Sequence, residues 1–511
     1  MAEQGAGSID GERRRRFGRG LGLATRTQVT AHAFMARRAE LGLTRRRVRM
    51  ESEPGRRQTM AILASITLTV VICLGALFWS FLRPAGSVGD SMIIADQTSG
   101  ALYVKVGTTL YPALNLASAR LIAGQPANPV RVRRSEIDAM PRGAIVGIPG
   151  APSELTATAP ASSSWLVCDA VTKAFGAGAP EPVTTTVIDG QPALTDRRHT
   201  LAASDAILLR YADEVWLIRD GRRSKVDPTQ RPVLLALGVS DEALAAARPI
   251  SRGLFDAIPV GPALTVPAIP NAGAPAGFPN PPGPVGTVIS TPQVGGQTTY
   301  SVVLSAGVQQ VSPIVAQILA NASGTGAPIP VVAGSALAAM PAVNALDLSV
   351  YPDAPLQLVD TQANPATCFW WQRSDGEAKA VTAIVSGPTI PVPADKAGAA
   401  VQMVRADKAS VQADQVYFAP GYANYVVLTG NSPTAATQES LWWVSESGVR
   451  FGVARDQDTL RALGFASPPK PAPWAVLRLL AGGPMLSKAD ALVRHDILPV
   501  DVNVGTLEQP K

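Results

Sequence analysis

The sequence predicts an α+β protein: a single transmembrane helix followed by an elongated extracytoplasmic domain with a central β-rich part and four similar α+β repeats. Three observations lead to this fold class. One long apolar run stands early in the chain, and many short β-like runs end at turns. A strand–turn–strand–helix pattern also recurs at a spacing close to 200 residues.

The membrane helix is predicted from the run Met60–Leu82, which contains no charged residue. At 1.5 Å per residue a helix of this length reaches roughly 34 Å, enough to cross a hydrocarbon core of about 30 Å. A cleaved signal peptide would need a shorter apolar region much closer to the N-terminus. We therefore expect an uncleaved transmembrane helix at 59–83, with Trp79 and Phe81 at the membrane interface.

Charge predicts the orientation of this helix. Residues 1–57 hold 14 Arg and 6 acidic residues, a net charge of +8, whereas the whole chain carries +6. Because basic residues near a membrane helix stay on the cytoplasmic side, we expect residues 1–58 in the cytoplasm and residues 84–511 in the periplasm. The arginine runs are explained by topology and anionic lipid, so we exclude nucleic acid as a partner. The predicted location is a single-pass protein of the inner (plasma) membrane.

The cytoplasmic segment Thr25–Glu51 predicts an Arg-rich amphipathic helix. Four small or apolar residues recur at helical spacing, and arginines surround them. Such a helix before an anchor can lie on the bilayer or dock on an acidic partner domain. The alternative is a solvated helix without a partner. The candidate docking residues are Val29, Phe34, Arg37, Arg38, Arg45, Arg46 and Arg49.

Three cysteines bear on the compartment. Cys73 lies in the anchor, and Cys168 and Cys368 lie outside, where thiols oxidise and disulfides persist. We expect these two to pair. A disulfide between them would close a loop of 200 residues and stabilise the fold by roughly 5 kcal/mol at most. The alternative is two buried free thiols.

Internal similarity predicts the repeats. Ala101–Ile122 and Tyr300–Leu319 share two strands, a Gly turn and a helix expected to start at Pro112 and Pro313. Val215–Gly238 and Leu441–Gly464 likewise share strand, turn, strand and a helix ending in Leu-Gly. The expected units span about 95–145, 205–262, 298–345 and 439–490, with central strands around 164–190 and 366–435. A Pro-rich linker at 261–286 joins the two halves as a spacer, a surface strap or a disordered segment.

Catalytic patterns are missing from the sequence. The chain has three histidines, His32, His199 and His495, without metal-ligand spacing. It also lacks a G-x-S-x-G elbow and a phosphate-binding loop. We interpret His199 as a surface histidine rather than part of a triad. The sequence thus predicts no catalytic residue, no cofactor and no metal, and leans against an enzyme.

A family resemblance adds to this interpretation. The tail LGLATRTQVTAHAFMARRAELGLTRRRVRMESEPGRRQ, the single anchor, and the outer stretches IIADQTSGALYVKVG, MPRGAIVGIPGAP, SSWLVCDAV and ESLWWVSESG resemble the EccB component of actinobacterial type VII (ESX) secretion systems. The likeness runs from about Gly20 to His495. Within the family it is nearest to the paralogue of the ESX system numbered five.

The resemblance implies a structural subunit of the secretion membrane complex. Its implied partners are other copies of itself, the EccC ATPase, EccD, EccE, the mycosin protease, and membrane lipid. It also implies a disulfide in the outer domain, at the places of Cys168 and Cys368, and repeats similar to a phage-lysin fold that binds cell walls. Peptidoglycan is therefore a possible contact. The alternative functions are a membrane-linked ATPase, a label given to the family, and a peptidoglycan-binding module.

Overall fold

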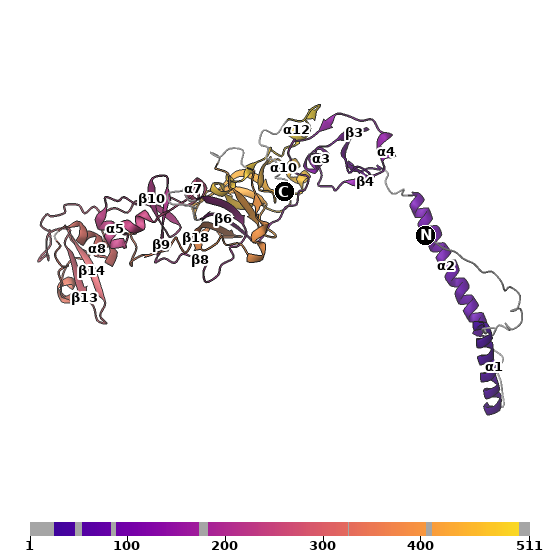
Figure 1. Ribbon diagram of the computed structural model, residues 1–511, viewed down its shortest axis with the longest axis horizontal. Helices are drawn as coiled ribbons and strands as arrows, with labels where there is room; N and C mark the ends of the chain where they lie inside the picture. The colour runs from indigo at the N-terminus through magenta and orange to yellow at the C-terminus, as the bar shows by residue number, and fades with distance from the viewer. Residues whose placement is uncertain are drawn as a thin grey trace, which may run out of the picture. The chain divides into compact units, whose positions relative to one another are not determined.

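The computed structural model describes residues 25–45, 54–82, 88–172, 182–324, 326–404 and 411–499, and separates the chain into two units, Met1–Ala85 and Gly86–Lys511 (Figure 1). The first unit holds helices α1 (Arg26–Arg45) and α2 (Pro54–Leu82). In α2 the 22 residues Gln58–Trp79 form the one helical stretch, among the residues described, that is long and apolar enough to cross a membrane.

A seven-stranded sheet forms the centre of the second unit, in the order β19-β20-β7-β6-β17-β18-β8. It takes strands from both halves of the chain, and the antiparallel partners β6 and β17 lie in the middle. The bounds are β6 (Ser162–Val171), β7 (Val183–Asp189), β8 (His199–Thr200), β17 (Ala366–Ser374), β18 (Val381–Gly387), β19 (Val401–Gln402) and β20 (Gln415–Phe418), with a 3-10 helix η1 (Ala394–Ala399) before β19.

Alternation along β6 and β17 explains why this sheet is buried on both faces. Trp165 and Val167 point to one face, with Phe369 and Trp371 beside them, whereas the two cysteines point to the other. Because side chains alternate with a period of two, a continuous apolar run produces a strand covered on both sides.

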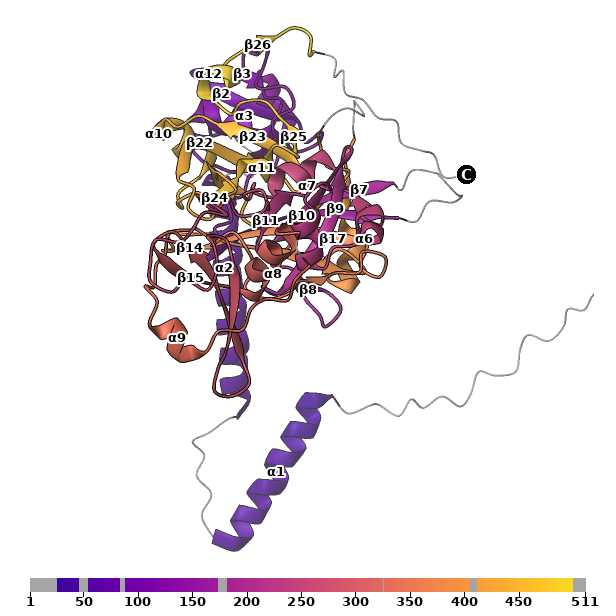
Figure 2. The same ribbon diagram turned by 90° about the vertical axis from the view of Figure 1, so that its left-hand side faces the viewer.

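Four smaller units share one topology: three antiparallel strands, a helix, and a return segment parallel to the first strand. Elements of these units are labelled in Figures 1 and 2. The first repeat has β1 (Ile93–Asp96), β2 (Leu102–Val106), β3 (Thr109–Pro112), α3 (Leu116–Ala123), β4 (Val130–Val132), α4 (Arg134–Asp138) and β5 (Ile145–Val146). The second has β9 (Asp205–Tyr211), β10 (Glu214–Arg219), β11 (Arg222–Lys225), α5 (Arg231–Leu237), α6 (Asp241–Ala245), β12 (Arg248–Pro249) and α7 (Arg252–Ala257).

The third repeat has β13 (Val288–Pro292), β14 (Thr298–Leu304), β15 (Gly307–Val311), α8 (Pro313–Ala322) and α9 (Gly334–Ala338). The fourth has β21 (Tyr425–Thr429), β22 (Thr437–Val444), β23 (Val449–Val453), α10 (Gln457–Leu463), β24 (Lys470–Pro473), α11 (Trp474–Leu477) and β25 (Ala481–Gly482). Short elements outside the repeats are β16 (Gln357–Leu358), which pairs with β9, α12 (Lys488–Ala491) and β26 (Arg494–His495). The third and fourth repeats thus begin with a strand that lies before the starts predicted at 298 and 439.

Local sequence explains the helix ends. Gly124, Gly238 and Gly464 each follow a repeat helix with φ between 70° and 82°, a left-handed conformation that glycine adopts without strain. The prediction that Pro112 starts a helix is wrong. Pro112 ends β3, and α3 begins at Leu116 because the Asn115 side chain caps it by accepting from the Ser118 N–H.

The repeats pair across the two halves of the chain. Helix α3 of the first repeat packs with α10 of the fourth in one apolar cluster, and α5 of the second packs with α8 of the third in another. The second and fourth repeats also meet through α7 and α11 beneath the central sheet. Each half therefore supplies one member of every pair, and the body cannot be divided into two independent halves.

The Pro-rich segment 261–286 is a strap rather than a spacer. Leu264 is buried against the cluster that joins the second and third repeats, and Phe278 is buried in the third repeat. The Val285 N–H donates to the Ala274 carbonyl, which closes the strap on itself. The strap consequently fastens the third repeat to the second.

Candidate functional site: membrane anchor and disulfide-joined core

The helix predicted in the tail is present as α1, and its described side chains lie mostly at the surface. Val29 is 55% exposed and Phe34 is 40% exposed. At 100° per residue Phe34 lies about 140° around the helix from Val29, so the two do not share a face. Arg37 is exposed and Arg38 is half-buried. Arg46, Arg49 and the side chain of Arg45 lie outside the described residues.

The anchor helix α2 exposes its apolar side chains all around, because both sides of the run carry large residues such as Leu63, Ile66, Val70 and Trp79. Three hydroxyl side chains return their hydrogen bonds to the helix itself, with Thr67 and Thr69 donating to carbonyls one turn earlier. Hydroxyl groups that are satisfied within their own helix suit a lipid environment. The chemistry of α2 is that of an anchor.

The predicted disulfide is present between Cys168 and Cys368, which face each other in the β6–β17 register. Both cysteines are buried, together with Leu166, Ile188 and Val385. The bond therefore ties the two chain halves at the centre of the seven-stranded sheet. Cys73 is a free cysteine in α2.

A buried carboxylate connects this sheet to the second repeat. Asp169 accepts hydrogen bonds from the Ser251 N–H at 2.6 Å, from the Ser251 hydroxyl at 2.9 Å and from the Thr185 hydroxyl at 2.9 Å. Ser251 also caps α7. Burial raises the pKa of Asp169 to about 6, because desolvation outweighs the three donors. Its polar contacts fix the orientation of α7 under the sheet.

Matched arginine–aromatic stacks lie in the second and fourth repeats. The Arg223 guanidinium lies 3.7 Å from the centroid of Phe255 and 5.6 Å from that of Trp216. The Arg450 guanidinium lies 4.9 Å from the ring centroids of both Trp442 and Trp474. Trp216 and Trp442 sit on the second strands of their sheets, and the arginines on the third. Cation–π contact lets each repeat keep a cation in a partly apolar site.

A direct contact joins α7 and α11. Arg478 donates to the Asp256 carboxylate, and Asn431 donates to the carbonyls of Asp256 and Ala257 at the end of α7. Gly253 permits the close packing here, because a Cβ at this position would lie 3.2 Å from the Leu479 side chain and that side chain would have to shift. The second and fourth repeats thus brace one another below the disulfide.

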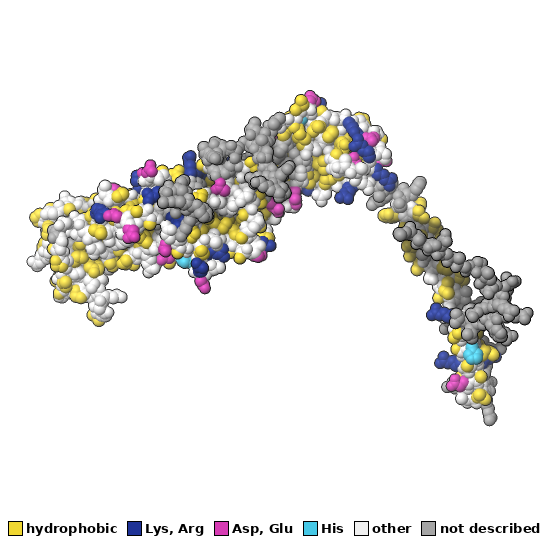
Figure 3. Space-filling model, in the orientation of Figure 1, with side chains coloured by type: hydrophobic (Ala, Val, Ile, Leu, Met, Phe, Trp, Pro, Cys, Tyr) yellow, Lys and Arg dark blue, Asp and Glu magenta, His cyan; other side chains and the backbone are white. Residues whose placement is uncertain are grey.

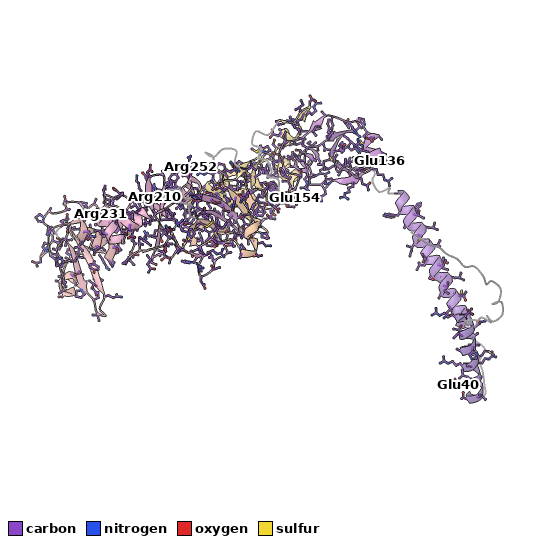
Figure 4. All side chains as sticks on the ribbon, viewed as in Figure 1. Glu40, Glu136, Glu154, Arg210, Arg231 and Arg252 are labelled. Carbon is purple, nitrogen blue, oxygen red and sulfur yellow. A yellow bond between two sulfur atoms is a disulfide. The ribbon has the colours of Figure 1, made fainter. Side chains whose placement is uncertain are left out.

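Groups that could carry catalysis are scattered. No cluster of three or more His, Cys, Asp or Glu occurs within the described residues. His199 is exposed on β8, and the His495 ring nitrogen Nε2 lies 2.7 Å from the Gly147 carbonyl. Figure 4 shows Glu136, Glu154 and Arg252 at separate places along the second unit.

One hollow of about 830 Å³ lies beside Glu154 and is lined by Phe418, Tyr422 and Trp443. Its lining includes two carboxylates, Glu154 and Glu446, but among the described residues that form it there is no Lys, Arg or His. Phosphate groups are bound mainly by cations and by backbone N–H groups at helix starts. The hollow therefore lacks the side chains that a nucleotide site would use.

Several features of this core escaped the sequence interpretation. The pairing of the first repeat with the fourth joins residues more than 300 positions apart, and no local pattern signals it. The contact between Asp169 and Ser251 was not predicted. Its one available signal was the lone Asp in the apolar run SWLVCDAV, because a buried carboxylate needs a hydrogen-bond partner. The Trp–Arg stacks could have been sought in the aligned runs around Trp216 and Trp442.

A helix long and apolar enough to span a membrane, followed by four β-rich repeats around a disulfide-joined sheet, defines the class of membrane-anchored proteins with a braced multi-repeat domain. Comparison with known families makes this specific. The family model described as "Type VII secretion system ESX-1, transport TM domain B" matches residues 21–500. The chain belongs to this family, the EccB proteins of type VII secretion systems.

Relatives and solved structures agree with this membership. The chain is 56% identical over 512 residues to the "ESX-5 secretion system ATPase EccB5" of Mycobacterium tuberculosis (strain ATCC 25618 / H37Rv), covering 100% of both chains. It is 39% identical to the "ESX-3 secretion system ATPase EccB3" of Mycolicibacterium smegmatis, over 95% of this chain and 94% of the relative. The predicted likeness to the ESX-5 paralogue is confirmed.

Among solved structures, a chain of an intact ESX-5 inner membrane complex matches with a TM-score of 0.77 and 56% identity, over 96% of this chain and 99% of that one. The EccB3 dimer from the ESX-3 core complex matches with a TM-score of 0.71 and 38% identity, over 79% of this chain and 100% of that one. The α+β fold with one apolar helix and a sheet-rich outer domain is confirmed by these matches.

Proposed function

We propose that this chain is a structural subunit of a type VII secretion inner membrane complex, holding the machine together through its outer domain. The observation that carries the proposal is the full-length match to a chain solved inside an intact ESX-5 inner membrane complex. The braced core supports it, because a disulfide and paired repeats make a rigid body suited to holding neighbours at fixed positions.

Extraction of the membrane in mild detergent tests the assembly. The chain is expected to migrate with a complex of megadalton order, well above the mass of its own 53.1 kDa polypeptide. The expected partners in that complex are further copies of itself, EccC, EccD, EccE and the mycosin protease. Recovery of the chain as a monomer in every detergent tried would overturn the proposal.

Orientation is the second part of the proposal: α1 in the cytoplasm and the second unit in the periplasm. The arginine excess before α2 and the disulfide after it support this direction. Protease added to cells stripped of their outer envelope should digest the repeats and spare an epitope placed at α1. The reverse pattern would contradict both compartments.

Docking by α1 is the third part. A chain lacking residues 1–50 keeps α2 and should still insert in the membrane. It should, however, recover less of the cytoplasmic partners. Phe34→Asp should reproduce part of this loss, because an exposed aromatic ring is the residue type most able to anchor a partner groove. Ala39→Asp, about 140° around the same exposed helix from Phe34, serves as the control, and unchanged recovery of the partners with both variants would make α1 a plain solvated helix.

ATP hydrolysis is a second candidate function, because the EccB relatives carry the word ATPase in their names. Purified full-length chain should then turn over ATP, and turnover should persist after any EccC is removed. Glu154→Gln and Glu446→Gln in the hollow beside Trp443 should leave the rate unchanged, because this hollow, in its described lining residues, lacks the cations that bind phosphate groups. Activity that follows contaminating EccC through purification would exclude it.

A further inference from the structure

The third repeat and its strap contain no charged side chain. From Ala257 to Leu346 the sequence has no Asp, Glu, Lys, Arg or His, although 16% of the whole chain is Asp, Glu, Lys or Arg. In Figure 3 the surface over β13, β14 and α8 shows only apolar and uncharged polar side chains. Soluble surfaces normally carry both signs of charge, so this region is exceptional within the molecule.

An uncharged surface favours contact with a copy of itself. When identical copies meet around a symmetry axis, a side chain near the axis faces its own equivalent, and a charge there would face the same charge. Other occupants fit less well. A membrane surface would call for Lys and Arg. A glycan would call for exposed aromatic rings, but the only aromatic residues in the stretch are the buried Phe278 and the half-buried Tyr300.

The shape of the repeat supplies complementary parts. The β13–β14 hairpin ends in the turn Gln293–Gln297, closed by a 2.7 Å hydrogen bond from the Gln293 N–H to the Gln297 carbonyl. Val294 at its tip is fully exposed. At the base of the same hairpin lies an apolar groove of about 500 Å³, lined by Val266 and Val285 of the strap and by Leu319 of α8.

We propose that two copies of this chain join through their third repeats, with the hairpin tip of each copy seated in the groove of the other. Val288 lines the groove and Val294 forms the tip, six residues apart, which is roughly 20 Å along an extended strand. Two hairpins placed side by side in opposite directions bring each tip to the other's base. The contact is reciprocal and closes as a dimer. It rests on the proposed role in a complex with several copies of the chain.

Cross-linking tests the contact directly in full-length protein. In a Cys73→Ser background, chains carrying Val294→Cys are co-expressed with differently tagged chains carrying Ala320→Cys, which lies in α8 at the groove. Only two chains together can form the new disulfide. A reducible dimer containing both tags is expected. A matched pair with Val381→Cys, a 62%-exposed valine on the central sheet, in place of Val294→Cys should give none.

Charge insertion supplies the second arm. Val294→Asp changes a fully exposed side chain, so the fold is expected to persist. The share of dimer in detergent should fall by about tenfold or more, because each copy would bring a charge into an apolar groove. Val381→Asp, the control, should leave the share of dimer unchanged. Unchanged dimer in Val294→Asp, or cross-linking equal to the control, would overturn the contact. If Val294→Asp leaves the dimer intact but abolishes sedimentation with purified peptidoglycan, the surface binds cell wall instead and the proposed contact is overturned. A wild-type chain that is monomeric throughout would instead count against the proposed function.

Discussion

The third repeat differs most informatively from the second and fourth. All three have three antiparallel strands and a helix, but the second and fourth place an arginine between aromatic rings and pack beneath the central sheet, whereas the third carries no charge and is held by a strap and α8. One topology therefore serves two purposes. The second and fourth repeats keep half-buried arginines as braces, and the third repeat has an uncharged surface.

The largest expected effect is the loss of stability when a core side chain is removed from the central sheet rather than from the third repeat. Phe369→Ala, at a fully buried position of the central sheet, should lower the free energy of unfolding by about 3–5 kcal/mol. Ile289→Ala, equally buried in the third repeat, should lose about 2–5 kcal/mol, but mainly in protection of β13–β15. Hydrogen exchange of the purified outer domain measures both the global and the local loss of protection. Uniform loss of protection in the Ile289 variant would contradict the separateness of the third repeat.

Removing the disulfide should lower the stability of the central sheet and of the repeats packed beneath it. The double variant Cys168→Ser, Cys368→Ser is expected to lose about 2–5 kcal/mol, because the bond closes a loop with a sequence separation of 200. Thermal unfolding measures the loss. Cys73→Ser is the control and should leave the melting temperature of the outer domain unchanged. Equal melting of the double variant and the wild type would mean that strand pairing alone joins the halves.

A pH series tests the Asp169 connection. Its pKa is raised from 3.8 to about 6, so its proton stabilises the fold fully below pH 3.8, and this contribution disappears as the pH rises through 6. The span corresponds to about 3 kcal/mol. Asp169→Asn should flatten the fall in melting temperature between pH 4 and pH 6. Some slope should persist, because burial also raises the pKa of Asp189. An unchanged profile would exclude Asp169 as its source.

The smallest effect concerns the two stacks. Arg223→Met and Arg450→Met should each cost about 0.5–2 kcal/mol, since the methionine keeps much of the apolar contact but loses the cation. Arg231→Met, which removes an exposed ion pair with Asp241, should cost less than about 1 kcal/mol. Chemical denaturation compares the three. A marked inequality between the Arg223 and Arg450 variants would show that the two repeats do not use their arginines alike.

Local patterns predicted much of this fold. The apolar run specified α2, and the Leu-Gly endings specified where α5 and α10 stop, because glycine at a helix end is a short-range requirement. Cys168 and Cys368 were predicted to pair from compartment alone. Pro112 was a misleading signal because its fixed φ suits a strand end as well as a helix start, and Asn115 caps the helix instead.

Long-range features could not be predicted in the same way. Packing of α3 against α10 depends on which apolar faces meet after folding, and the sequence of either helix is compatible with many partners. The docking residues of the tail remain a prediction, since helix α1 shows the exposure of Val29 and Phe34 but no partner. The residue ranges assigned to the repeats also stay a prediction of ours.

The position of β6 has a consequence for biogenesis. Its neighbour β17 is translated roughly 200 residues later, which at about 5–20 residues per second is a delay of about 10–40 s. During this interval the edge of β6 that will pair with β17 has amide and carbonyl groups without their final hydrogen-bond partners. An unpaired strand in a growing polypeptide can associate with the wrong partner, so folding of the nascent subunit calls for a holding factor or rapid synthesis of its second half.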